Sequence, residues 1–208
     1  MIKNIKIKAR PHNWPRSGTT GINEWALVVV DMQNDYCTRG CYMDKAGFNL
    51  EPLRKPIENI SSVIKMAREN GLEVIFTRHG EVNTEQLPST ASSKNTFCWE
   101  ITEELKPTPA ERVFDKSTTS AFVSSSIDQY LKQRGIKYLA FCGNTIDCCV
   151  HSTLRSANDL GYKCLLLEDC CGAINESLHK WSIESIIVEN GVFGAVTNSS
   201  DFIKSITS

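Results

Sequence analysis

Two adjacent cysteines, Cys148 and Cys149, are the residues best suited to covalent chemistry in this sequence. They follow an apolar run at 138–142 and a Gly-Asn-Thr turn, and apolar residues at helical spacing come after them. This pattern predicts a strand, a tight turn and a helix that begins at the two thiols. A thiol at a helix N-terminus lies at the positive end of the helix dipole, where its pKa is lowered and the thiolate is favoured. We therefore take Cys149 as the candidate nucleophile, with Cys148 competing for the role.

Two charged residues, Asp31 and Lys116, follow other predicted strands and could assist a thiol. Asp31 can accept the thiol proton if burial raises its pKa, and Lys116 can hold the carboxylate charge and favour a thiolate. Backbone N–H groups in the turn before the helix can bind a developing oxyanion. This set of groups suits acyl transfer through a thioester-type intermediate that water releases.

Each of these residues also has a plain structural explanation. An Asp after a strand often caps a turn, a Lys on the surface is usually solvated, and a Cys is often a small buried hydrophobe. The joint placement favours the catalytic interpretation, because parallel strands gather their carboxyl ends at one ligand-binding edge. His151 lies two residues into the predicted helix, so we expect it on the surface or facing a partner rather than paired with Cys149.

The rest of the chain alternates predicted strands with predicted helices. Strands are expected at residues 26–30, 72–77, 112–115, 138–142, 163–167 and 191–196. Helices are expected at residues 56–67, 122–131, 148–160 and 176–188, and a short one closes the chain. This alternation predicts βαβ units and a parallel sheet. Residues 79–111 are expected to form a long loop with a short helix at 98–105, and residues 1–23 an arm on the surface or on a neighbouring subunit.

Length and composition favour a single globular domain spanning residues 1–208. The chain has 208 residues, a net charge of −1 and no basic stripe, which argues against a nucleic-acid partner. It has no apolar run near the ~20 residues of a membrane span and no signal peptide at its start. Its nine cysteines are odd in number, which argues against a disulfide framework and for mostly free thiols. The adjacent cysteine pairs lack the spacing of a zinc site.

Four segments together resemble the isochorismatase-like cysteine hydrolases: residues 28–35, 77–78, 114–116 and 143–157. The resemblance covers nearly the whole chain and implies a doubly wound, three-layer α/β fold with a six-stranded parallel sheet. It also implies a catalytic triad of Asp31, Lys116 and Cys149, and it selects Cys149 over Cys148 because the family nucleophile precedes a valine. A cis peptide before Thr145 is implied as well, with the N–H groups of Thr145 and Cys149 forming the oxyanion hole.

Within the family, the chain is most similar to ureide amidohydrolases, including biuret and ureidoacrylate hydrolases. This implies a metal-free hydrolase without a cofactor, which releases ammonia from a small ureide, carbamoyl compound or amide. Glu189 stands where biuret hydrolases have a glutamine, which disfavours biuret itself. The metal-binding histidine of nicotinamidases is missing around Asp44. The expected substrate-binding residues are Arg78, Glu189, Asn144, Tyr36, Phe48 and Phe122.

Other functions remain open at this point. Isochorismatase-type hydrolysis does not need the thiol, and a nicotinamidase-like amidase would need the missing metal ligands. A catalytically idle interaction module is opposed by the intact triad. The family resemblance and the apolar residues of the arm lead us to expect a cytoplasmic homo-oligomer, a dimer or a tetramer.

Overall fold

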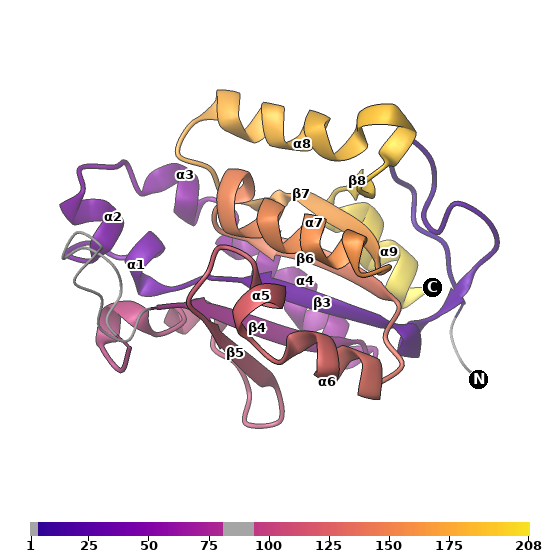
Figure 1. Ribbon diagram of the computed structural model, residues 1–208, viewed down its shortest axis with the longest axis horizontal. Helices are drawn as coiled ribbons and strands as arrows, with labels where there is room; N and C mark the ends of the chain where they lie inside the picture. The colour runs from indigo at the N-terminus through magenta and orange to yellow at the C-terminus, as the bar shows by residue number, and fades with distance from the viewer. Residues whose placement is uncertain (1–3, 81–93) are drawn as a thin grey trace.

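A six-stranded parallel sheet with helices on both faces forms the body of the protein (Figure 1). The computed structural model describes residues 4–80 and 94–208. The strand order is β5-β4-β3-β6-β7-β8. The strands are β3 (Trp25–Val30), β4 (Glu73–His79), β5 (Arg112–Lys116), β6 (Tyr138–Gly143), β7 (Lys163–Cys171) and β8 (Ala195–Thr197). The predicted three-layer α/β fold is confirmed.

The central strand β3 is buried on both faces of the sheet. All six of its residues are buried. Alternate side chains enter different cores, with Leu27 and Val29 in one and Ala26 and Val28 in the other. The continuous aliphatic run that predicted this strand is therefore the consequence of burial on both faces.

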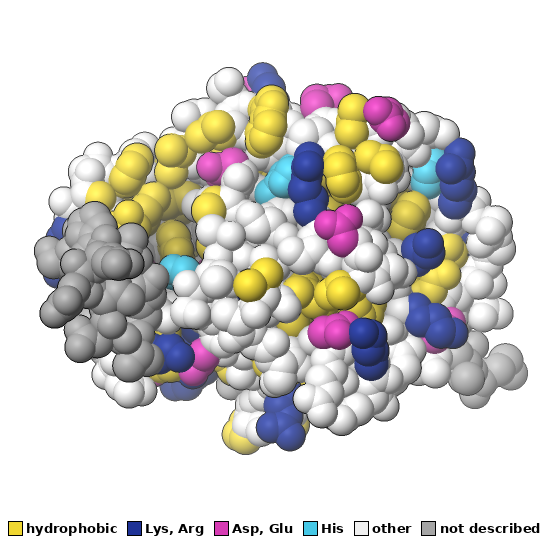
Figure 2. All heavy atoms as spheres, in the orientation of Figure 1, with side chains coloured by type: hydrophobic (Ala, Val, Ile, Leu, Met, Phe, Trp, Pro, Cys, Tyr) yellow, Lys and Arg dark blue, Asp and Glu magenta, His cyan; other side chains and the backbone are white. Residues whose placement is uncertain are grey.

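Helices α4 (Ile57–Glu69) and α9 (Ser199–Thr207) cover one face of the sheet. The other face is covered by α5 (Ala121–Ser124), α6 (Ile127–Gln133), α7 (His151–Asp159) and α8 (Glu176–Gly191). The single helix predicted at 122–131 is wrong, because Ser125 is extended and separates α5 from α6. Figure 2 shows acidic and basic side chains interspersed on the viewed face, which includes this layer.

The short elements lie mainly before β4 and between β4 and β5. They are β1 (Asn4–Ile5), β2 (Thr20–Gly21), η1 (Ile22–Glu24), α1 (Asn34–Cys37), α2 (Tyr42–Lys45), α3 (Glu51–Arg54), η2 (Phe97–Trp99) and η3 (Glu103–Leu105). The short helix predicted at 98–105 is therefore two separate 3-10 turns. Part of the loop predicted at 79–111 lies outside the described residues.

The last strand begins later than the sequence suggested. The strand predicted at 191–196 is wrong in its first half, since β8 begins at Ala195. Glu189 and Asn190 at the end of α8 have φ values of 49° and 62°. These two residues interrupt both helix and strand geometry, and the strand begins after the turn that follows them. In the other direction, β7 extends to Cys171, beyond the predicted end at 167.

The N-terminal arm packs into its own chain instead of lying on the surface. Ile5 and Ile7 are fully buried in the core on the α4 side. The backbones of Arg10 and Val196 exchange two hydrogen bonds of 2.9 Å each. The arm therefore adds a short antiparallel bridge to the outer edge of β8.

One disulfide joins Cys41 and Cys98, and the other seven cysteines are free. The expectation of mostly free thiols is confirmed. The sequence did not reveal this single pair, because its two cysteines lie 57 residues apart and no local pattern connects them. Among the described residues, no helix has the length and apolar character needed to span a membrane.

Candidate active site

The carboxyl ends of three strands bring Asp31, Lys116 and Cys149 together. Asp31 follows β3, Lys116 ends β5, and Cys149 lies after β6 in the π-helical turn η4 (Ile146–Val150). Lys116 Nζ is 2.7 Å from Asp31 Oδ2 and 3.4 Å from Cys149 Sγ. The side chains of Asp31 and Lys116 are 0% exposed. A buried ammonium group therefore bridges a carboxylate and a thiol.

Asp31 is fixed by the neighbouring strand β4. Its backbone N–H donates to the carbonyl of Thr77 over 3.2 Å, and the Thr77 hydroxyl donates to Asp31 Oδ1 over 2.6 Å. Asp31 has a φ of 48°, so its side chain leaves the direction of the strand at this point. The carboxylate is thus held with one oxygen on Thr77 and the other on Lys116.

Lys116 remains charged in this environment. Burial opposes the ammonium form, but Asp31 and Cys149 outweigh it and raise the pKa of Lys116. The ammonium also donates to the carbonyl of Thr118 over 3.0 Å and lies 3.4 Å from His79 Nδ1. His79 is the register partner of Lys116 in the β4–β5 ladder. Sequence reasoning missed His79, because the predicted strand stopped at residue 77 and the pairing of the two strands was unknown.

The pKa values of the two adjacent thiols, Cys148 and Cys149, shift in opposite directions. Cys148 is exposed, and its contact with Cys149 lowers the pKa of Cys148 to about 7. The same contact, burial and the charge of Asp31 raise the pKa of Cys149, and Lys116 only partly opposes them. The predicted lowering at Cys149 is therefore wrong, because this helix start lies inside the protein rather than in water. Cys149 holds its proton at rest and needs an acceptor such as Asp31.

The turn before Cys149 is tightly constrained. The peptide bond between Asn144 and Thr145 is cis. Gly143 has a φ of 122°, and a Cβ there would lie 2.0 Å from the carbonyl oxygen of Val30. Only glycine fits this approach. The N–H of Ile146 donates to the carbonyl of Gly172 over 2.8 Å, which fixes the other side of the turn on the residue that follows β7.

The expected substrate-binding residue Asn144 faces the protein interior. It is fully buried, and its amide Nδ2 donates to the carbonyl of Leu53 in α3 over 3.1 Å. Its Oδ1 lies against the backbone of Gly172, where an added Cβ would be 2.1 Å away. Asn144 thus joins the turn to α3 and to Gly172, the residue after β7, and does not point at the triad.

The aromatic candidates lie in three different places. Burial, together with the charges of Cys149 and Asp31, holds the pKa of Tyr36 well above its ordinary value. Phe122 packs against Tyr162 in the core, with ring centroids 5.6 Å apart. Phe48 follows α2 and is 41% exposed. Of these three aromatic residues, Tyr36 is the one whose pKa the charges of the triad raise.

The two charged candidates are not brought to the triad. Arg78 pairs with Asp115 and Glu100 over 2.9 Å each, and its guanidinium lies 3.5 Å from the ring centroid of Trp99. Glu189 is exposed at the end of α8. Because α8 connects the carboxyl end of β7 to the start of β8, Glu189 lies at the opposite end of the sheet from Cys149.

Gln33 is a second residue that sequence reasoning missed. Its amide donates to the carbonyls of His79 and Trp99 over 2.9 and 2.7 Å, and its Oε1 accepts from the His79 N–H over 2.7 Å. Gln33 is fully buried. Its position two residues after Asp31 was the available signal. It holds the end of β4, and so His79, beside the triad.

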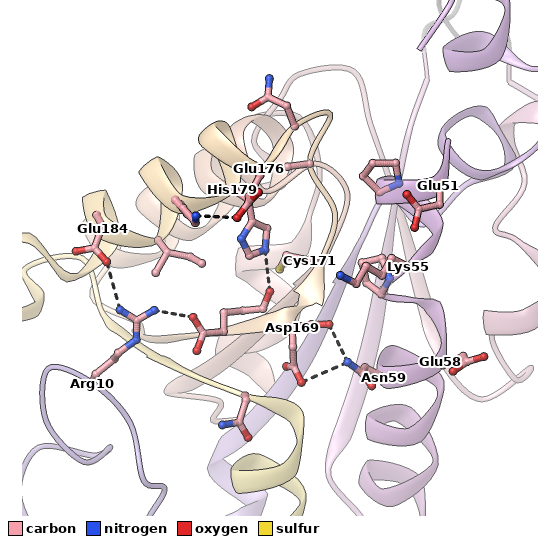
Figure 3. Close-up of a pocket in the computed structure, with 18 residues that line it drawn as sticks. Arg10, Glu51, Lys55, Glu58, Asn59, Asp169, Cys171, Glu176, His179 and Glu184 are labelled. Carbon is pink, nitrogen blue, oxygen red and sulfur yellow. Dashed lines mark hydrogen bonds and ion pairs between the residues drawn. The ribbon is translucent and has the colours of Figure 1, made fainter. Parts of the chain in front are cut away.

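A separate cleft of about 910 Å³ lies between α8 and the α3–α4 region (Figure 3). Its charged groups largely pair with one another. Arg10 contacts Glu168 over 2.6 Å and Glu184 over 3.3 Å, and Asn59 donates to the carbonyl of Asp169 over 3.0 Å. No triad residue lines this cleft. We therefore do not assign the candidate active site to it.

Comparison with known proteins assigns the chain to a family. The isochorismatase domain model matches residues 25–201 of this chain. The chain belongs to the isochorismatase family. The ureidoacrylate amidohydrolase RutB of Variovorax paradoxus is 33% identical over 86% of this chain and 80% of that protein. RutB of Agrobacterium fabrum is 34% identical over 74% of this chain and 78% of that protein.

Solved structures of other proteins share the fold. A cysteine hydrolase from Pseudomonas syringae pv. phaseolicola aligns with a TM-score of 0.82 and 21% identity, covering 100% of this chain and 99% of that one. N-carbamoylsarcosine amidase from Thermoplasma acidophilum aligns with a TM-score of 0.71 and 24% identity, covering 85% and 96%. The predicted relationship to isochorismatase-like cysteine hydrolases is confirmed, and the chain is a hydrolase of this family.

Proposed function

We propose that the protein hydrolyses a C–N bond of a small ureide, carbamoyl compound or linear amide and releases ammonia, with Cys149 as the nucleophile. The observation that carries the proposal is the buried Lys116, which lies 2.7 Å from Asp31 and 3.4 Å from Cys149. The similarity to ureidoacrylate amidohydrolases supports the substrate class.

The first half of the reaction begins with a proton transfer. Asp31 accepts the proton of the Cys149 thiol, and Lys116 stabilises the thiolate that forms. The sulfur then attacks the substrate carbonyl carbon, and the N–H groups of Thr145 and Cys149 receive the oxyanion. As the C–N bond breaks, Asp31 returns its proton to the leaving nitrogen, and ammonia departs from a thioester-type acyl enzyme.

The second half regenerates the thiol. Asp31 takes a proton from water, the hydroxide attacks the acyl carbon, and the C–S bond breaks. The proton on Asp31 then returns to Cys149. Each half moves one proton out and back, so no external acid or base is consumed. The raised pKa of Cys149 suits this cycle, because a poorly stabilised thiolate is a strong nucleophile and is readily reprotonated.

Tyr36 is the proposed substrate contact. Burial and the charges of Cys149 and Asp31 raise the pKa of its phenol well above the ordinary value, so it stays neutral. A neutral phenol can donate a hydrogen bond to a ureido oxygen or accept one from a ureido nitrogen. This contact would orient the carbonyl carbon toward the sulfur.

The test compares Cys149→Ala with the matched variant Cys148→Ala, assayed for ammonia release over a panel of ureides, carbamoyl compounds and linear amides. We expect Cys149→Ala to abolish release and Cys148→Ala to retain most of it. Mass spectrometry of quenched wild-type enzyme should show an acyl adduct on Cys149. Turnover that survives Cys149→Ala would favour thiol-independent hydrolysis, and a wild-type enzyme inactive on the whole panel would refute the proposal.

A further inference from the structure

The ladder between β3 and β4 ends where the chain turns at Asp31. Its last register pair is Val30 with Thr77, and the N–H of Asp31 still donates to the Thr77 carbonyl over 3.2 Å. A regular parallel ladder would continue with the Asp31 carbonyl accepting from the N–H of His79. That carbonyl instead accepts from the N–H of Gln33 over 2.8 Å. The last residue of β4 is then held from this side by a side chain.

The side chain in question is the carboxamide of Gln33, which has the same donor and acceptor groups as a peptide unit. Its Oε1 accepts from the His79 N–H over 2.7 Å, and its Nε2 donates to the His79 carbonyl over 2.9 Å. The other Nε2 proton goes to the carbonyl of Trp99 over 2.7 Å. Exchanging the oxygen and nitrogen would place donors against donors, so the amide has one orientation. Gln33 thus supplies both backbone-type bonds to the end of β4.

The end of β4 in turn holds Lys116. Strand β5 is an outer strand of the described sheet, and β4 is its neighbour (Figure 1). The last register pair between them is His79 with Lys116, and the N–H of Gly80 donates to the Lys116 carbonyl over 3.0 Å. A displacement of the end of β4 therefore moves the lysine whose ammonium lies 2.7 Å from Asp31 and 3.4 Å from Cys149.

The turn at Asp31 explains why this substitute is needed. With a φ of 48°, Asp31 leaves the strand direction and directs its carboxylate to Lys116. The same turn takes its carbonyl away from β4. Gln33 compensates for that loss, so β4 can continue to the residue that pairs with Lys116. It is fully buried, which protects these bonds from competition with water.

Building on the proposed function, we propose that Gln33 is a positioning residue for the hydrolysis. Its carboxamide holds the end of β4 and thereby sets the distance of the Lys116 ammonium from Asp31 and Cys149. Gln33 acts through the two strands and not by contact with the reacting atoms.

Asn34 offers a matched comparison, because it is buried and adjacent in the sequence. Its amide donates to the carbonyl of Phe97 over 2.8 Å, in the same turn η2 that Gln33 contacts through Trp99. Its Oδ1 accepts from the hydroxyl of Thr38 over 2.9 Å. Asn34→Leu therefore loosens η2 and leaves the pairing of Gln33 with β4 in place.

The first measurements need no substrate. Gln33→Met keeps the length of the side chain and removes its hydrogen bonds. We expect the His79 amide of this variant to exchange with solvent about tenfold faster, because the end of β4 opens more often. Alkylation of Cys149 by iodoacetamide, mapped by mass spectrometry, should slow several-fold, because the thiolate loses part of the stabilising charge of Lys116. Asn34→Leu should match the wild type in both measurements.

Turnover separates positioning from substrate binding. On an amide or ureide that the wild type hydrolyses, we expect Gln33→Met to lower kcat by about tenfold with KM changed by less than about twofold, since Gln33 does not touch the substrate. Circular dichroism checks that each variant is folded. Gln33→Asn, which keeps the amide on a shorter side chain, replaces Gln33→Met if that variant does not fold, and it should slow alkylation in the same direction.

Several outcomes would overturn the proposal. A folded Gln33→Met protein with the wild-type alkylation rate would do so, as would a raised KM at unchanged kcat. An equal loss in Asn34→Leu would place the effect in η2 and not at the end of β4. Exchange and alkylation are measured without substrate, so a wild-type protein inactive on every tested amide refutes the proposed function and still leaves the role of Gln33 decided by these two measurements.

Discussion

Lys116 is the residue on which the geometry of the candidate site depends. Its ammonium contacts Asp31, Cys149, the carbonyl of Thr118 and the ring of His79. An ammonium has three protons, so these four neighbours share them. A change at any one neighbour therefore moves the Lys116 ammonium toward or away from the sulfur of Cys149.

His79 offers a direct test of this arrangement. Asn carries an oxygen at the position of the His79 Nδ1, whereas Leu has similar bulk without an acceptor. We expect His79→Asn to retain most of the alkylation rate of Cys149 by iodoacetamide, and His79→Leu to raise it several-fold, because the three protons of Lys116 are then shared by three neighbours and one of these is the sulfur. Mass mapping of the alkylated peptides measures the rate without a substrate. Equal rates for the two variants would show that His79 does not position Lys116.

For individual residues, the sequence predicted which side chains form the candidate site, but it did not predict their surroundings. Strand ends identified Asp31, Lys116 and Cys149, because the carboxyl ends of parallel strands share one edge. The pKa of Cys149 could not be predicted, because it depends on burial and on the contact with Cys148. The role of Gln33 depends on hydrogen bonds to residues 46 and 66 positions away, which no local pattern reveals.

The contact between α7 and α8 is the element-scale feature that differs most from expectation. His151 was expected on the surface or facing a partner, but it is buried by α8. Its ring stacks on Trp181 with centroids 5.7 Å apart and hydrogen-bonds the Ser185 hydroxyl over 2.6 Å. Burial and the nearby Arg155 lower the pKa of His151 to about 4. The helix spacing correctly located His151 on α7, but the packing of α8 over it required the three-dimensional fold.

This buried imidazole should make stability depend on pH. The folded pKa is about 4, below the unfolded value, so between these values the unfolded state binds more protons. Stability is therefore fully present above pH ~6.5 and falls as the pH drops toward ~4, by about 3 kcal/mol at most. Urea unfolding across this range measures the slope. His151→Gln should flatten it relative to the matched His12→Gln, and an unchanged slope would assign the effect to other groups.

At the scale of the whole molecule, the N-terminal arm is part of the core. Its alternating Lys and Ile residues looked like a polar extension because Lys3, Lys6 and Lys8 dominate the local composition. The buried positions in the described part of the arm are Ile5 and Ile7, and the contacts that bury them come from distant parts of the chain. The alternation itself was the signal of a strand with one buried face.

The arm should therefore contribute measurably to folding. We expect Ile7→Ala to lower the free energy of unfolding by 2–5 kcal/mol, roughly the cost of a large-to-small change in a core. Lys8→Ala, one residue away and mostly exposed, should change it by less than about 0.5 kcal/mol. Chemical denaturation followed by Trp fluorescence compares the two. A small effect for Ile7→Ala would mean that the arm detaches before the body unfolds.

The bridge between Arg10 and Val196 has a consequence for how copies of this chain could join. A parallel sheet grows into a fibre only when both of its outer strands offer free backbone groups to further chains. Here the arm occupies the outer side of β8, while β5 is the opposite outer strand of the described sheet. Within the described sheet, strand pairing between copies would therefore take place at β5. It would end once two copies have paired there, so the arm on β8 opposes the growth of a fibre.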